Sequence, residues 1–230
     1  MLIISLLIII LITYYKDQEI DRYFKYSVFL WENFINIDKI REKVIQKPIR
    51  NKFCAAVISN CRAQFRLSFI EKLNKYKKVD VGGKCNKNIS KVTNKFDFLS
   101  NYKFSISMEN SNGDGYISEK LVHSFIGGTI PIYYGDYMIE EFINPKTYIL
   151  IKGESDIDQK IEYIKKIDND DKLYFSIMKE KPILDFNFVS KIDDIELKQF
   201  FKNIFIQDKI KAYRRDNNYY EYDYNCKKYI

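Results

Sequence analysis

The sequence has little of what metal-stabilised or disulfide-rich scaffolds need. It contains one histidine and four cysteines in 230 residues. No two cysteines stand at zinc-finger spacing, which argues against a structural zinc site. Cys54 lies in an apolar run and is predicted to be a buried thiol. Cys61 and Cys85 follow predicted strands, so a bridge between them is open if the compartment is oxidising.

Two sequence signatures of phosphate binding are also missing. The spacing of Gly113 and Gly115 does not match the dinucleotide fingerprint, and no phosphate-loop pattern occurs. No internal repeat is found. Hydrophobic residues make up 46% of the chain and charged residues 30%. This balance excludes a disordered tail, a collagen-like fibre and a polytopic membrane protein, and it predicts a globular fold.

Long hydrophobic runs are limited to the first residues, Met1 to Tyr15. The run is shorter than the roughly 20 residues that span a bilayer, and it lacks the basic segment that opens a secretory signal. Two interpretations stay open. The segment is either a membrane anchor, which would give membrane association through residues 1–15, or an apolar part of the fold.

The net charge is +7, from 38 basic and 31 acidic residues, and the isoelectric point is near 9.0. A basic chain of this kind suits an anionic partner such as a nucleotide, a nucleic acid or a lipid surface. The excess is modest and spread along the chain. Nothing beyond the net charge favours a nucleic-acid module, and no nucleic-acid partner is predicted.

Short apolar runs alternate with amphipathic helical patterns from Phe53 onward, which predicts an α/β fold with a Rossmann-like parallel sheet and helices on both faces. Strands are predicted at residues 53–58, 79–81, 102–108, 129–134 and 148–151. Helices are predicted at residues 65–73, in a brief turn from Phe98, at 118–126, from 155 to 167, and ending near Lys181 before Pro182.

The unit from Lys103 to Ile126 is where chemistry is expected. A parallel strand ends there, a turn-rich loop follows, and Ser118 is predicted to cap a helix. Backbone N–H groups at such a helix start suit a pyrophosphate. Glu119 and Lys120 lie in its first turn, where the alternative is an ordinary solvated helix start. Tyr116 is open in the same way, because loop tyrosines often pack rather than bind.

Five segments in order carry a family resemblance. They are residues 53–60 (FCAAVISN), 79–84 (VDVGGK), 102–110 (YKFSISMEN), 115–120 (GYISEK) and 128–135 (GTIPIYYG), with Arg66 after the first. In this order and spacing the chain resembles the donor domain of the α-1,3-fucosyltransferases, glycosyltransferase family 10, over about residues 51–185. The resemblance implies the C-terminal half of a GT-B enzyme that transfers L-fucose from GDP-fucose to a glycan or glycoprotein acceptor in α-1,3 linkage, with inversion.

The resemblance also implies donor-binding residues. These are Arg66, Asn110, Tyr116, Glu119 and Lys120. In this interpretation Arg66 and Lys120 neutralise the diphosphate, Asn110 and Tyr116 fix the nucleotide, and Glu119 accepts hydrogen bonds from donor hydroxyls. No tightly bound cofactor and no divalent metal are expected.

The resemblance divides the chain into three parts. Residues 1–50 form the hydrophobic segment and a remnant of the acceptor domain, residues 51–185 bind GDP-fucose, and residues 186–230 form a C-terminal helix and polar tail. Because family members carry the general base in the acceptor domain, the base is unassigned here. The alternative is a nucleotide-sugar-binding fragment or partner subunit without catalysis of its own. The location implied is membrane-associated, Golgi-type in a eukaryote, or cytoplasmic.

Two other candidates are interpreted as structural. His123 stands beside an apolar stripe, where a lone histidine is usually part of the packing. Asp156-Ile157-Asp158 and Asp168-Asn169-Asp170 imitate a metal-binding Asp-x-Asp motif. Both are predicted to lie at helix starts, where carboxylates favour the helix dipole without any metal.

Overall fold

A computed structural model describes residues 50–112, 117–141 and 143–184, together with residues 199, 202, 205 and 206. The described residues belong to two compact units, with residues 50–184 in the first. Gln199, Lys202, Phe205 and Ile206 belong to the second and are helical. The predictions for Met1–Tyr15 and for Tyr116 lie outside the described residues. The three-part division of the chain stays a prediction.

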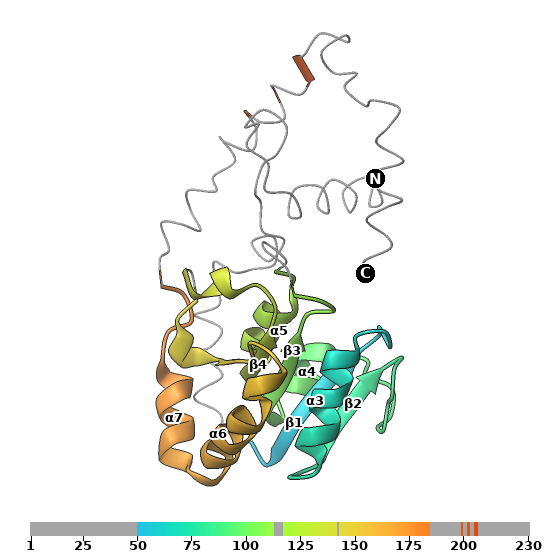
Figure 1. Cartoon of the computed structure of the whole chain (residues 1–230), viewed down its shortest axis with the longest axis vertical. Helices are drawn as coiled ribbons and strands as arrows, with labels where there is room; N and C mark the ends of the chain where they lie inside the picture. The colour runs from blue at the N-terminus through green and yellow to red at the C-terminus, as the bar shows by residue number, and fades with distance from the viewer. Residues whose placement is uncertain are drawn as a thin grey trace. The chain divides into compact units, whose positions relative to one another are not determined.

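The first unit is built on a five-stranded parallel sheet with the order β2-β1-β3-β4-β5 (Figure 1). The strands are β1 (Lys52–Ile58), β2 (Val79–Gly83), β3 (Tyr102–Met108), β4 (Ile130–Tyr134) and β5 (Ile149–Leu150). The predicted strands are confirmed within about two residues at each end. Parallel strands covered on both faces need continuous apolar runs, which is why the sequence pattern located them.

Helices and short 3-10 turns connect the strands. The helices are α3 (Gln64–Asn74), α4 (Lys95–Leu99), α5 (Lys120–Ile126), α6 (Ile157–Asn169) and α7 (Asp171–Lys179). The 3-10 turns are η3 (Tyr137–Glu141), η4 (Pro145–Thr147) and η5 (Glu154–Asp156). The succession of strand, helix and parallel strand is that of a doubly wound fold, as the sequence predicted.

The helices cover both faces of the sheet. On one face, α3, α6 and α7 pack their apolar stripes on alternate strand residues such as Cys54 and Phe104. On the other, α5 packs against Tyr133 and Leu150, and Leu99 of α4 packs against Ala55. Side chains alternate across a strand, so neighbouring residues 54 and 55 serve opposite cores. The fold class predicted from the sequence is confirmed.

The boundaries of two elements differ from the prediction. The turn expected to begin at Phe98 is helix α4, which ends at Leu99 and begins after Asn94, whose side chain accepts from Phe96 N at 2.9 Å. Strand β2 continues through Gly82 to Gly83. Gly83 has φ +96°, and a Cβ there would collide with the Ile58 carbonyl, so the strand end requires glycine.

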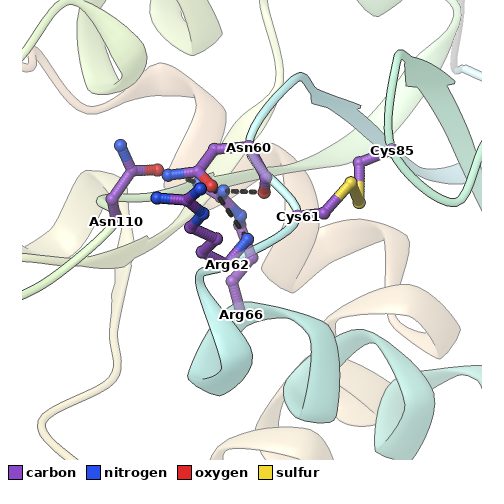
Figure 2. The surroundings of a disulfide bond; sticks show 6 residues. All are labelled: Asn60, Cys61, Arg62, Arg66, Cys85 and Asn110. Atoms are coloured by element: carbon purple, nitrogen blue, oxygen red, sulfur yellow. Dashed lines mark hydrogen bonds between the residues drawn. A yellow bond between two sulfur atoms is a disulfide. The ribbon is translucent and has the colours of Figure 1, made fainter.

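A disulfide joins the carboxyl ends of two neighbouring strands. Cys61 follows β1 and Cys85 follows β2, with their Cα atoms 5.4 Å apart (Figure 2). The bridge that the sequence left open is thus made in the structure. The disulfide joins the turn that leads into α3 to the end of β2. Cys54 is fully buried, as predicted, and burial raises the pKa of its thiol, which keeps it unreactive.

Asp168 corrects one prediction about the Asp-x-Asp segments. It lies in the last turn of α6, not at a helix start, and its side chain is 2% exposed. Lys77 Nζ and Tyr76 Oη donate to its carboxylate at 2.9 and 3.0 Å, and Lys103 Nζ lies 3.3 Å away. Burial alone would raise the pKa of Asp168, but these partners hold it below its usual range. The carboxylate joins α6 to the sheet rather than presenting a metal ligand.

Asp168→Asn is expected to lower the free energy of unfolding by about 2 kcal/mol at neutral pH, because Lys77 and Lys103 lose the buried anion that they share. A lowered folded-state pKa contributes stability above the unfolded value of about 4, and the contribution is lost as the pH falls further. The variant should therefore lose less stability than the parent as the pH falls below about 4. Urea unfolding across pH measures both, with the exposed Asp158→Asn as the control. Equal losses in the two variants would contradict the assignment.

The described ranges contain no helix long and apolar enough to cross a bilayer.

Candidate functional site

The strand order places a crevice at one end of the sheet. From β1 the chain passes to β2 on one side and then returns to β3 on the other. Ligands of open α/β sheets bind at such a reversal, outside the carboxyl ends of the two strands. In this chain Asn60 follows β1, and Glu109 and Asn110 follow β3. A ligand-binding site is therefore expected at these positions.

Arg66 of α3 reaches across this crevice and is only 5% exposed. Its guanidinium donates to the carbonyl of Met108 at 2.9 Å, the carbonyl of Asn60 at 3.1 Å and Oδ1 of Asn110 at 3.1 Å. Figure 2 shows the guanidinium lying between Asn60 and Asn110. Arg66 and Asn110, both predicted site residues, are thus brought together. The acceptors of these three bonds are neutral oxygens.

Lys120 begins α5 and is held by a buried carboxylate. Its Nζ lies 2.6 Å from Oε2 of Glu109, and the Glu109 side chain is fully buried. The other carboxylate oxygen accepts from Ser118 N at 2.8 Å and Ser118 Oγ at 2.6 Å. Ser118 was predicted to cap the helix, which is wrong, because its hydroxyl donates to Glu109. Glu119 occupies the N-cap position and caps with no side-chain bond.

Glu119 lies beside Lys120 with about a third of its side chain exposed, and the two charged groups are 4.0 Å apart. Burial would raise the pKa of Glu119. The charges of Lys120 and Lys95, together with its own backbone N–H, hold that pKa below its usual range. The carboxylate is therefore ionised and acceptor-only at neutral pH. This is the state needed to accept hydrogen bonds from hydroxyl groups.

One small cavity joins the cations. Arg66, Lys95 and Lys120 all line a space of about 20 Å³ that is also bordered by Ser105 and Ser124. A space of this size admits about one water molecule. A nucleotide must therefore lie over the strand ends rather than inside the cavity. The structure thus brings Arg66 and Lys120 to the same place in the fold from helices on opposite faces of the sheet.

Lys95 and His123 form a contact next to this cavity. Lys95 Nζ lies 2.8 Å from Nδ1 of His123, and the Phe96 ring meets the imidazole edge-on at 5.2 Å. His123 stands one helical turn after Glu119 on α5. The contact links α4 to α5 on one face of the sheet.

The arrangement suits an anion with hydroxyl groups. Three cations meet at the carboxyl ends of β1 and β3, and an ionised carboxylate stands beside them. Within the described ranges, no three His, Cys, Asp or Glu side chains are grouped so as to hold a metal ion. Tyr116, the remaining predicted site residue, lies outside the part of the chain that the structure describes.

A family model matches residues 46–201, and its description is glycosyltransferase family 10 (fucosyltransferase), C-terminal part. The chain belongs to glycosyltransferase family 10. The family resemblance read from the sequence is confirmed, and with it the type of transferase to which the chain is related.

Relatives of this family are similar to part of the chain. The α-(1,3)-fucosyltransferase FucT of Helicobacter pylori is 32% identical over 168 residues, which cover 71% of this chain and 35% of the relative. Glycoprotein 3-α-L-fucosyltransferase A of Drosophila melanogaster is 36% identical over 142 residues, covering 57% of this chain and 28% of the relative. The chain spans about a third of the length of these curated relatives.

Solved structures show the same fold. A crystal structure of an α1,3-fucosyltransferase with GDP-fucose is 25% identical, with a TM-score of 0.73 over 86% of this chain and 70% of the other. A structure of an α1,3-fucosyltransferase with GDP matches the same shares at 25% identity, with a TM-score of 0.75. This agrees with the parallel sheet and the Rossmann-like architecture of a family 10 donor domain.

Sequence reasoning gave no role to Glu109 or Lys95. Glu109 had one detectable signal, since a carboxylate directly after a buried parallel strand lies at the ligand-binding edge of the sheet. Its contact with Lys120 could not be seen, because i to i+11 pairs have no fixed geometry across a loop. Lys95 had no signal at all in the sequence, because only the packing of α4 on α5 brings it to the cavity.

Proposed function

We propose that this family 10 chain binds the diphosphate of GDP-fucose at the carboxyl ends of β1 and β3 and serves in the inverting transfer of L-fucose to a glycan hydroxyl in α-1,3 linkage. The main support is that Arg66 and Lys120 line one cavity at the carboxyl ends of β1 and β3, where the strand order reverses. The solved relative with GDP-fucose supports the choice of donor.

Each proposed site residue has a chemical task. Arg66 and Lys120 stabilise the charge that grows on the diphosphate as the bond to fucose breaks. Asn110 is fixed by its bond with Arg66, and its amide N–H groups are available to the nucleotide. Glu119, held ionised by its neighbours, accepts from donor hydroxyls. The assignment of Tyr116 to the nucleotide stays a prediction.

The transfer exchanges one bond for another at the anomeric carbon of fucose. The acceptor oxygen forms a bond to this carbon, the bond to the phosphate oxygen breaks, and GDP leaves with the bonding electrons. The acceptor proton passes to a general base. The described residues contribute stabilisation of the leaving group, and the base remains assigned by resemblance to the acceptor domain.

Donor binding and transfer test the proposal separately. In calorimetry, GDP is expected to bind about 30-fold more tightly than guanosine, because its diphosphate makes two charge-assisted contacts that guanosine cannot make. With an N-acetyllactosamine-type acceptor, radiolabelled fucose should pass from GDP-fucose to the glycan, with or without a chelator. No GDP binding would refute the proposed site. Binding without transfer would refute catalysis by this chain and favour a donor-binding fragment or partner subunit.

The acceptor, a glycan or glycoprotein, is part of this proposal. Membrane association through residues 1–15 and a Golgi-type or cytoplasmic location stay predictions, because those residues lie outside the described ranges.

A further inference from the structure

Arg66 and Lys120 alone do not balance the negative charges that a bound diphosphate would bring to the proposed donor site. The Lys120 ammonium is already 2.6 Å from the fully buried Glu109 carboxylate. Arg66 and Lys120 are matched by the Glu109 and Glu119 carboxylates, which leaves no net charge. A nucleoside diphosphate brings at least two negative charges. A site built from these groups alone would hold a net negative charge, which costs energy where solvent screening is weak.

Lys95 is the third cation at the same place. It begins α4, is half-buried, and lines the cavity that Arg66 and Lys120 also line. The charge of Lys95 reaches the site, because Lys95 and Lys120 both help to lower the pKa of Glu119. A cation placed here adds the charge that Glu109 cancels.

The contact with His123 fixes where the Lys95 ammonium lies. An ammonium donates hydrogen bonds and accepts none, so Nδ1 of His123 at 2.8 Å must be the acceptor. The ring is packed edge-on by Phe96, and its helix carries Glu119 and Lys120. The long Lys95 side chain is thereby held close to the site before any ligand arrives.

We infer that Lys95 is a third diphosphate-binding residue of the donor site, and that His123 is the positioning residue that holds its ammonium there. The inference rests on the proposed function. It assigns His123 a part that its place beside an apolar stripe does not suggest.

The binding test compares Lys95→Met with Lys91→Met, an exposed lysine four residues earlier. Lys95→Met should weaken GDP binding about tenfold and leave guanosine binding unchanged, while Lys95→Arg keeps most of the GDP affinity. Lys91→Met should behave as the parent. An equal loss for GDP and guanosine, or no loss for GDP, would overturn the inference. If the parent itself fails to bind GDP, the proposed function fails instead.

His123 supplies a spectroscopic readout, because it is the single histidine of the chain. Its ring proton signals can be followed by NMR as the pH is changed. Without the Lys95 ammonium the ring should take up its proton at a higher pH, because a neighbouring cation opposes protonation of the ring. Lys91→Met should not move this midpoint. An unchanged midpoint in Lys95→Met would show that the two side chains are not in contact and would overturn the positioning role.

Discussion

Lys120→Ala is expected to weaken GDP binding about 100-fold, whereas His123→Ala weakens it only about threefold. The lysine variant loses a charge-assisted contact with the diphosphate. It also leaves the Glu109 carboxylate buried beside the ligand without its cation, so repulsion adds to the loss. His123→Ala loses only the group that holds Lys95. Calorimetric titration with GDP measures both variants.

A second variant separates binding from folding. Removing Lys120 alone should also lower the free energy of unfolding by about 2 kcal/mol, since Glu109 keeps only its two Ser118 donors. Lys120→Met combined with Glu109→Gln should recover most of that stability but not the GDP affinity. Equal affinities for the Lys120 and His123 variants would discredit the site. Full recovery of GDP affinity in the double variant would assign Lys120 to folding alone.

Arg66→Lys is expected to lower the free energy of unfolding by about 3 kcal/mol and to weaken GDP binding more than tenfold. The guanidinium spans two carbonyls and one amide oxygen, which fixes the ends of β1 and β3 relative to each other. A lysine presents its donors from one nitrogen and cannot reach the three acceptors together. The conservative exchange is therefore not conservative at this position.

Arg62 offers the matched control. It is exposed, lies in the same turn, and appears beside Arg66 in Figure 2. Arg62→Lys should leave both unfolding and GDP binding unchanged. Chemical denaturation and calorimetry on the two variants decide the matter. A stable Arg66→Lys protein with parental GDP affinity would remove Arg66 from the site and from the framework of the crevice.

The fold was predictable where local pattern and packing agree. Residues 53–58 are a continuous apolar run, and a strand buried on both faces favours that composition. Helix α6 was predictable because its buried residues Ile157, Ile161 and Ile164 recur at helical spacing. Ser118 shows the limit of this approach. Its residue type predicted a helix cap, but its hydroxyl donates to the buried carboxylate of Glu109, nine residues earlier.

The family motifs located much of the candidate site but not how it is held together. Arg66, Asn110, Glu119 and Lys120 were named from their segments, and the structure brings Arg66 to Asn110 and to the cavity shared with Lys120. Glu109 and Lys95 were not assigned. Both act through contacts whose partners are distant in sequence or lie on another helix, and such contacts leave no periodic trace.

The sequence by itself determined the alternation of strands and helices and the family, because burial and turn formation depend on residues within one element. Only the tertiary structure decided which cations meet, which carboxylate already neutralises one of them, and which ring orients another. Those are distances between elements, and they are set by the order of the strands and the packing of the helices on them.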